Sequence, residues 1–360
     1  MPPIGQTHDR ALTRRLGIGR PLLRSKPGQR PATVVAAGLW SVTLAGIAVV
    51  WGTTGGYPFG ATDPSAIISP LGGVPAPIGT AGAYVVAVIG TGTATAILSE
   101  STGARASGLT AIAWAIAAVL LLGVLDYRLL VIVAYAPLVV VSLPFGFLPV
   151  SDFLAAFTPA VVAQVCALVG GLAWSAVALG RTTPLRSRAS AARWGRRATV
   201  VAIAVPLVYA ATRWAWALGI PLGLNDELFR FGQQTGLWVI GAGLATLALA
   251  GAAVTSGLTM GWGERWPGWM PAIGARPIPV ALAVVPALIV ATLVTAAGLM
   301  FVRLTVTGTF DEAFTPLRGI QGSWAALGPE LLWPAWGPAL AIAALAYARR
   351  RALDDREELD

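Results

Sequence analysis

The sequence is poor in the residues that usually carry metal, redox or disulfide chemistry. Its 360 residues include one cysteine, one histidine and one lysine. Because a disulfide needs two cysteines, Cys166 cannot form one within the chain. The histidine, His8, lies in the polar N-terminal tail, so no apolar segment offers an imidazole to haem or zinc. We therefore expect no metal site and no other cofactor.

Motifs for nucleotides and metals are missing as well. The sequence has no phosphate-binding loop of the Walker A type, no zinc-binding HExxH and no paired aspartate-rich motif for prenyl diphosphates. No acidic residue lies in the middle of an apolar segment, where it could carry a proton or a sodium ion. These absences argue against ATP-driven transport by this chain alone. They leave open whether the protein is an enzyme, and no catalytic residue is assigned.

Charged residues are scarce, at 11% of the chain, whereas hydrophobic residues make up 56%. Soluble proteins carry about 25% charged residues. Apolar runs of about 18 or more residues, long enough to cross a bilayer as helices, recur along the whole sequence. We therefore predict an all-α fold, a polytopic transmembrane helical bundle. The apolar segments are 34–53, 81–98, 108–125, 129–148, 159–180, 199–219, 235–257, 279–302 and 334–348.

A ten-residue phrase occurs twice, each time at the end of an apolar segment. The copies are Trp51–Gly60 and Trp214–Gly223, in which Trp, Gly, Pro and Gly match at one constant offset. Trp anchors helix ends at the membrane interface, and Gly and Pro end a helix and turn the chain. The repeat predicts two parallel four-helix units, as in the halves of some transporters. The paired segments are 34–53 with 199–219, 81–98 with 235–257, 108–125 with 279–302, and 159–180 with 334–348.

Arginine-rich segments set the predicted topology. The N-terminal tail, the loop 181–197 and the C-terminal end are all basic, and such segments stay on the cytoplasmic side. The number of membrane crossings between two such segments must therefore be even. Segment 129–148 is the one apolar segment that has no counterpart in the other half, so we expect that it does not cross the membrane. We predict about eight spans, with 129–148 as a re-entrant or outer-face segment, for which Pro137, Pro144, Gly146 and Pro149 offer places to break a helix. The alternative is a ninth full span, with one half inverted.

Eight crossings place 20 basic residues inside and four outside, with Arg213 within a span. We therefore predict a multi-pass protein of the cell inner (plasma) membrane with both termini cytoplasmic. The predicted parts are a basic cytoplasmic tail, 1–32; a first membrane repeat, 33–181; a basic cytoplasmic loop, 182–198; a second membrane repeat, 199–351; and a charged C-terminal tail, 352–360.

Arg213 is the one charged residue well inside an apolar segment, where an ionisable residue is a functional hypothesis by default. In one interpretation it binds an anionic substrate or lipid headgroup in an outward-facing cavity. In the other it extends outward and pairs with Asp226 or Glu227, just past the helix end. The corresponding residue of the first half is Val50. The candidate binding residues are Arg213, Trp214, Trp216, Asp226, Glu227 and Arg230.

Other polar residues are predicted to have structural roles. We expect the charged residues at the outer helix ends to form a solvated rim, with a catalytic carboxylate among them as the alternative. Gln164 is expected to bond across helices and Cys166 to pack as a small side chain. The loop 261–271, rich in Trp and Pro, is expected to lie in the headgroup region of the inner face. The rim residues are Asp63, Asp126, Arg128, Asp152, Arg303, Asp311 and Glu312.

The pattern Trp214-Ala-Trp216-Ala-Leu-Gly219, with an arginine-rich and lysine-poor composition, resembles actinobacterial multi-pass integral membrane proteins of unassigned function. The resemblance covers most of both halves and implies a duplicated four-helix unit. It implies no activity.

Three functions follow as hypotheses. The first is a small-molecule or lipid binding or transport-type protein with an outward-facing cavity near Arg213. The second is a membrane-embedded enzyme acting on a lipid-linked substrate at the outer face through acidic side chains. The third is a structural or assembly subunit, in which small residues along Gly241–Gly251 pack a neighbouring helix. The expected partners are membrane lipid and, in the third case, another membrane protein, but no nucleic acid. The acids considered for catalysis are Asp126, Asp152, Asp226 and Glu227.

Overall fold

The protein is all-helical, as predicted. The computed structural model describes residues 31–60, 63–99, 106–144, 146, 149–182, 187–271, 274–315, 319–320 and 322–357. Apart from one isolated β-bridge between Arg265 and Pro277, the secondary structure of these residues is helical. The short elements are η2 (Ala66–Ile68), α6 (Val150–Ala155), α9 (Asp226–Thr235), η4 (Gly261–Gly263) and α12 (Phe310–Ala313).

Among the described residues, seven helices are long and apolar enough to cross a membrane. They are α2 (Pro31–Thr54), α3 (Ala76–Leu98), α7 (Pro159–Arg181), α8 (Arg188–Ala217), α10 (Leu237–Ser256), α11 (Val280–Thr307), and α14 (Trp333–Glu357) together with the short α13 (Trp324–Leu331) before it. An eighth candidate is α4 (Ala106–Gly123) taken with α5 (Tyr127–Ser142), which are bent by 68° at the break between them. These helices make the chain a multi-pass membrane protein.

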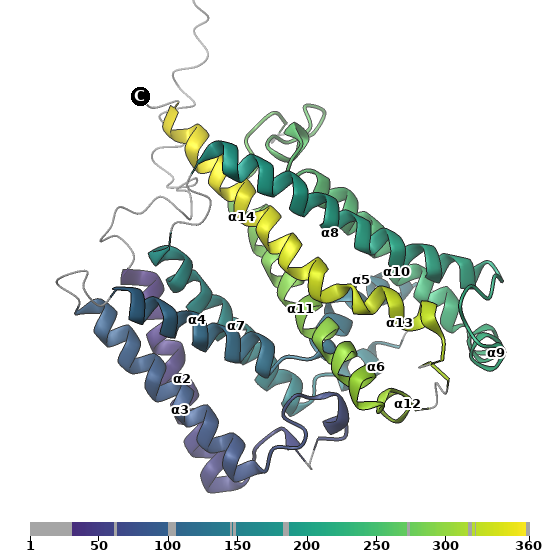
Figure 1. Cartoon of the computed structure of the whole chain (residues 1–360), viewed down its shortest axis with the longest axis horizontal. Helices are drawn as coiled ribbons and strands as arrows, with labels where there is room; N and C mark the ends of the chain where they lie inside the picture. The colour runs from purple at the N-terminus through teal and green to yellow at the C-terminus, as the bar shows by residue number, and fades with distance from the viewer. Residues whose placement is uncertain are drawn as a thin grey trace, which may run out of the picture.

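The long helices form two groups of four, seen side by side in Figure 1. The first group is α2, α3, α4 and α7, and the second is α8, α10, α11 and α14. Corresponding pairs pack in the two groups: α2 with α3 and α8 with α10, α4 with α7 and α11 with α14, α2 with α7 and α8 with α14. These three pairs of contacts recur in the two groups, whereas α3 packs on α4 in the first group and no matching contact of α10 with α11 stands out among the described residues of the second.

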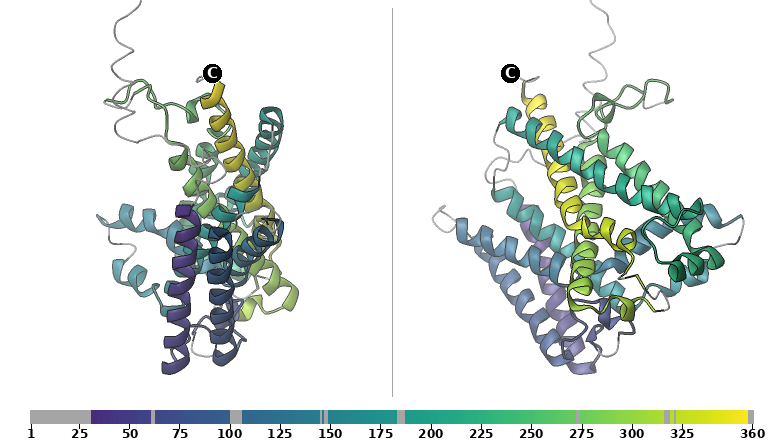
Figure 2. Two further views of the ribbon diagram at one scale, coloured as in Figure 1. Left: turned by 90° about the vertical axis from the view of Figure 1, so that its left-hand side faces the viewer. Right: turned by 45° about the vertical axis from the view of Figure 1, so that its right-hand side comes forward.

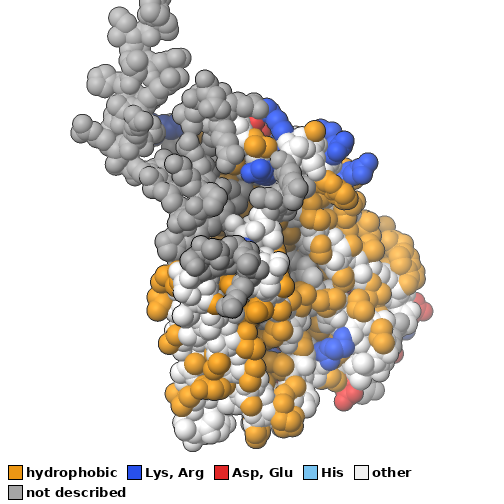
Figure 3. Space-filling view, turned by 60° about the vertical axis from the view of Figure 1, so that its left-hand side comes forward, with side chains coloured by type: hydrophobic (Ala, Val, Ile, Leu, Met, Phe, Trp, Pro, Cys, Tyr) orange, Lys and Arg blue, Asp and Glu red, His pale blue; other side chains and the backbone are white. Residues whose placement is uncertain are grey.

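The bundle has two distinguishable ends. Helix α2 begins at the upper end of the first group and α14 ends at the upper end of the second in Figure 2, and we call this the terminal end of the bundle. Helices α2 and α8 end at the opposite, distal end. Hydrophobic side chains are spread over the described part of the face shown in Figure 3, and Lys and Arg gather mainly near the terminal end. Large apolar side chains such as Val200, Val239 and Val254 are more than half exposed. An apolar surface of this extent fits contact with lipid.

Helix α5 is the element that joins the two groups. It packs on α7 of the first group and on α10 and α11 of the second. The predicted break at Pro137 is wrong, because α5 continues through this residue to Ser142. The chain turns afterwards, in the stretch that contains Pro144 and Gly146, the latter with φ 69°. Proline is therefore tolerated inside α5, and the turn depends on the residues beyond it.

The repeated phrase ends a helix at an equivalent position in both groups. Helix α2 ends at Thr54 and α8 at Ala217, which are equivalent positions at the constant offset of the phrase. The last glycines of the two copies, Gly60 and Gly223, have φ of 84° and 63°. Glycine enters this left-handed region at little cost, whereas other residues avoid it. The structural interpretation of the phrase is thus supported by its backbone.

Close contact of α2 and α7 forms the core of the first group. A Cβ on Gly170 would lie 2.1 Å from the ring of Trp40, so only glycine fits beside that indole. The Trp40 Nε1 donates to the carbonyl oxygen of Cys166 at 3.0 Å. Nearby, the Nε1 of the fully buried Trp174 donates to Ser41 Oγ at 3.2 Å. These contacts fix the two helices on either side of the cavity described below.

Candidate functional site

Arg213 lies near the distal end of α8 and is buried, with 8% of its surface exposed. It forms an ion pair with Glu330 of α13, which is also buried. Its Nη1 donates to Thr212 Oγ1 at 2.8 Å and to the carbonyl oxygen of Ala325 at 3.1 Å, and its Nη2 donates to the carbonyl oxygen of Ala326 at 3.4 Å. The short helix α13 therefore supplies most of the partners of this arginine.

Two aromatic rings complete the surroundings of Arg213. The guanidinium carbon lies 4.4 Å from the ring centre of Tyr209 and 4.5 Å from that of Trp216. Rings at this distance attract a cation through their negative faces. With Glu330 beside it, the arginine is neutralised within the chain, so it offers no net charge to an incoming anion.

The structure corrects the predicted partners of Arg213. Asp226 and Glu227 lie in the first turn of α9 and are exposed, and neither is the acid that pairs with Arg213. Arg230 is also exposed, and its Nε donates to the carbonyl oxygen of Asp226 at 3.1 Å. Trp214 is 41% exposed on another face of α8. Of the predicted set, the structure brings Arg213 and Trp216 together at one site.

A cavity of about 200 Å³ adjoins Arg213 and Trp216. We call it the aromatic cavity, because six of its lining side chains are aromatic. Its walls come from α5, which joins the two groups, from α8, α10 and α11 of the second group, and from the short helices α9, α12 and α13. The lining residues are Tyr135, Arg213, Trp216, Leu228, Leu237, Trp238, Ile240, Gly241, Leu244, Phe301, Phe310, Phe314, Ile320 and Ala326.

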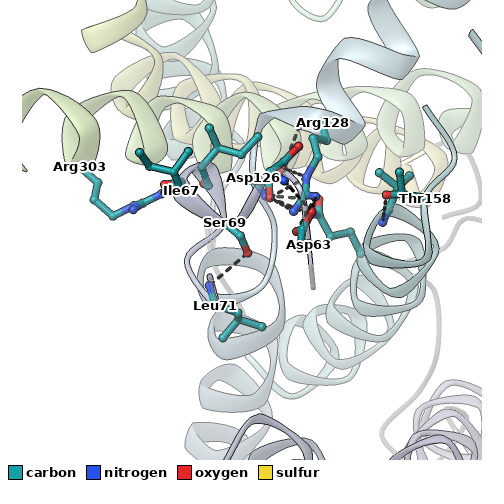
Figure 4. Close-up of polar contacts among 12 residues, drawn as sticks. Asp63, Ile67, Ser69, Leu71, Asp126, Arg128, Thr158 and Arg303 are labelled. Atoms are coloured by element: carbon teal, nitrogen blue, oxygen red, sulfur yellow. Dashed lines mark hydrogen bonds and ion pairs between the residues drawn. The ribbon is translucent and has the colours of Figure 1, made fainter. Parts of the chain in front are cut away.

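A second buried polar cluster joins the loop after α2 to the junction of α4 and α5 (Figure 4). Arg128 binds Asp126 through its Nη2 at 2.6 Å and Asp63 through its Nη1 at 2.8 Å. Gln164 Nε2 donates at 2.7 Å to the same oxygen, Asp126 Oδ2, that pairs with Arg128 Nη2, as expected for a residue that bonds across helices. The carboxylates are 6% exposed at Asp63 and 0% at Asp126. The predicted solvated rim is therefore wrong for these charges, which are buried and paired.

Arg303 of α11 holds the same loop from the second group. Its Nη2 donates to the carbonyl oxygens of Ile67 at 3.0 Å and Ile68 at 2.7 Å, both in η2. The loop is thus fastened on one side by Arg128 and on the other by Arg303 (Figure 4). Of the other predicted rim residues, Asp152 and Glu312 are exposed, and Asp311 Oδ2 accepts from the backbone of Gly319 at 3.3 Å.

A cavity of about 650 Å³ lies inside the first group. We call it the apolar cavity, because its lining includes no charged side chain. The first copy of the phrase and the loop after it close its distal end. Its lining residues are Trp40, Leu44, Ile47, Trp51, Gly56, Tyr57, Pro58, Phe59, Leu71, Val74, Ile78, Gly79, Gly82, Ala83, Val86, Val119, Leu120, Gly123, Val124, Phe157, Pro159, Val162, Ala163, Cys166 and Ala167.

Part of the lining of the apolar cavity is exposed at the surface of the bundle. Three of its lining residues, Ile78 of α3, Val119 of α4 and Val162 of α7, are exposed by 64%, 50% and 58%. Burial raises the pKa of Tyr57, which lies past the end of α2, above the usual value of a tyrosine. The phenol therefore stays neutral at physiological pH, and the lining carries no charge there.

No protein-family model, no curated protein and no solved structure matches this chain. What the two cavities hold must therefore be argued from their chemistry. Within the described residues, no three His, Cys, Asp or Glu side chains gather closely enough to hold a metal ion.

Sequence reasoning missed Glu330 and the apolar cavity. Glu330 lies in a stretch that looked like a polar loop, four residues before the apolar segment that starts at residue 334. An acid directly before a span, opposite an arginine within another span, is the signal that could have suggested the pair. The cavity has no such signal, because its lining residues are those of any apolar helix.

Proposed function

We propose that the protein binds a lipid in the apolar cavity, with the hydrocarbon chain between α2, α3, α4 and α7. The observation that carries the proposal is a space of about 650 Å³ with no charged residue in its lining. Small-molecule sites commonly measure about 300–1,000 Å³ and are mostly apolar. A binding or transport-type role within the membrane fits such a site.

The chemistry of the lining favours a hydrocarbon chain over water or an ion. A buried water needs about two to four polar partners, and an ion needs more. The cavity offers mainly aliphatic and aromatic surface, and its lining residues Ile78, Val119 and Val162 are also exposed on the apolar surface of the bundle. A lipid chain could enter there from the bilayer without crossing water.

We further propose that the two helix groups arose by duplication of one four-helix unit, in an actinobacterial type of membrane protein. The matching helix ends at Thr54 and Ala217 and the matching helix contacts support this. The units would have diverged in their cavities. The first unit holds the larger, apolar space, whereas in the second Arg213 and Glu330 occupy the distal end.

The proposed location is the plasma membrane, with the terminal end on the cytoplasmic side. With eight crossings, 20 basic residues lie on the inner side and four on the outer side, and this difference supports the orientation. The distal loop that covers the apolar cavity would then face outward. Lipid would be taken from, or given to, the outer half of the bilayer.

The observations favour lipid binding over the alternatives. Asp126, considered for catalysis, is engaged by Arg128 and Gln164. Of the small residues considered for a partner helix, a Cβ at Gly241 would lie 3.6 Å from Arg213 and one at Gly243 3.4 Å from Leu138, so this part of the stripe packs within the chain.

Filling the apolar cavity tests the proposal. Gly82 of α3 lines the cavity, and a Cβ on it would meet no atom within 4 Å, so Gly82→Phe places a ring in the cavity. Gly92, on the same helix, also has nothing within 4 Å and does not line the cavity, so Gly92→Phe is the matched control. Lipid that copurifies with each variant is extracted and measured by mass spectrometry.

Cys166 provides an internal reporter, because it lines the cavity and is the chain's only cysteine. Its rate of reaction with N-ethylmaleimide should fall when a long-chain phospholipid is added to delipidated protein. Gly82→Phe should lose the copurified lipid and the protection, and Gly92→Phe should keep both. Equal lipid content and equal protection in the two variants would show that the cavity is not a lipid site.

A further inference from the structure

We propose that the aromatic cavity beside Arg213 is a second binding site, which takes an uncharged, planar ring compound. The site is separate from the lipid cavity, because the two linings share no residue. The inference therefore does not rest on the proposed lipid binding. It rests on the rings around the cavity, on the charge state of Arg213 and on the volume.

Aromatic rings make up six of the lining side chains of the cavity, and several of them pack on one another. Trp216 and Trp238 have ring centres 4.8 Å apart, and Phe310 and Phe314 are stacked at 4.9 Å. Aromatic groups prefer offset stacking or edge-to-face contact at such distances. A planar conjugated ring can make both kinds of contact here, which a flexible chain cannot.

The charge of Arg213 gives no reason to expect an anionic ligand. Its ion pair with Glu330 makes the net charge at this wall zero. An anion would lose its hydration on entry and gain little from a cation that is already paired. An uncharged compound avoids this penalty. Water is a poor occupant too, since the lining gives it few polar partners.

The volume separates this site from the lipid cavity. About 200 Å³ accommodates a compact ring system, whereas the cavity of about 650 Å³ suits a long chain. Tyr135 brings one wall from α5, the helix that lies between the groups. Between α11 and α14 the described part of the chain has no helix as long as α5. A second site with a wall of this kind is therefore not formed by the described residues.

A photolabel can locate the ligand directly. The probe is 1-azidonaphthalene, an uncharged ring compound, which is irradiated with the purified full-length protein, and the labelled peptides are identified by mass spectrometry. Gly241 lines the cavity, and Gly241→Leu fills it from α10. Gly251, on the same helix, has no atom within 4 Å of a Cβ and does not line the cavity, so Gly251→Leu is the control. Naphthalene and 1-naphthalenesulfonate are the competitors.

We expect label on peptides that contain Tyr135, Trp216 or Trp238. Naphthalene should block it, and the sulfonate should not. Gly241→Leu should reduce it by about tenfold or more, and Gly251→Leu should leave it unchanged. If Gly241→Leu does not fold, Leu244→Trp enlarges another lining residue and should give the same loss. Label elsewhere, or equal label in a folded filled variant, would overturn the site. Stronger competition by the sulfonate would overturn the uncharged class and restore an anion site at Arg213.

Discussion

Arg213 of α8 and Glu330 of α13 form a buried ion pair across 117 residues of sequence. The pair lies where the short helix α13 meets the distal end of α8, beside the aromatic cavity. Two buried opposite charges stabilise each other, but each is costly when left alone. The pair therefore makes the position of α13 depend on α8.

Removing one partner of this pair should be more harmful than removing both. We expect Arg213→Met or Glu330→Leu alone to lower the free energy of unfolding by about 3–5 kcal/mol, because each leaves an unpaired buried charge. The double variant should lose less than either single variant. Thermal unfolding in detergent measures the three variants against the wild type. Arg230→Gln, at an exposed arginine, is the control and should unfold as the wild type does. Additive losses would mean that the two side chains do not act as a pair.

Arg303→Gln should loosen the loop over the apolar cavity. The change removes the donor that holds the carbonyl oxygens of Ile67 and Ile68. A buried carbonyl left without its partner costs about 1–3 kcal/mol. We expect faster hydrogen exchange in residues 63–74, measured by mass spectrometry, while α9 keeps its wild-type rate. Unchanged exchange in 63–74 would show that Arg128 alone fastens the loop.

The long helices could be predicted from the sequence because each is encoded by its own apolar run. Segment 34–53 became α2, and segment 159–180 became α7, within a few residues. Arg213 could be singled out for the same local reason, as a charge in an apolar run. Its partner could not, since Glu330 reaches it only through the tertiary position of α13, a helix of eight residues.

Other parts of the site depend on distances that a sequence does not contain. Asp63 and Asp126 looked like surface charges of two loops, but folding brings both onto Arg128 and excludes water from them. The volume of a cavity likewise depends on how far four helices stand apart. The residues that line an apolar cavity are of the same types as those that pack closely in an apolar core. The sequence therefore predicted neither the place nor the size of the apolar cavity.

Both termini should be cytoplasmic. The structure places the start of α2 and the end of α14 at one end of the bundle. The excess of basic residues in the segments at this end predicts that it is cytoplasmic. Fluorescent and alkaline phosphatase reporters are fused in turn before Met1 and after Asp360. We expect fluorescence and no phosphatase activity at both ends. Phosphatase activity at both would invert the proposed orientation, and activity at one alone would require an odd number of crossings.

The glycines of the repeated phrase should differ in their tolerance of alanine. Gly219 and Gly223 both have positive φ, at 87° and 63°, so alanine at either should cost about 1 kcal/mol through backbone strain. A Cβ at Gly219 would meet nothing within 4 Å, whereas one at Gly223 would lie 2.6 Å from the Cβ of Ala325. Gly223→Ala must therefore also displace α13, and should lower the unfolding temperature more than Gly219→Ala.

The first copy of the phrase should show the same order. Gly55 and Gly60 have φ of 70° and 84°, and a Cβ would be free at Gly55 but 2.9 Å from the carbonyl oxygen of Val74 at Gly60. Gly60→Ala should thus destabilise more than Gly55→Ala. It should also disturb the loop that closes the apolar cavity, so Cys166 should react faster with N-ethylmaleimide in this variant. If the two alanine variants of each copy unfold at the same temperature, strain alone limits these positions, and the close contacts of Gly60 and Gly223 contribute nothing.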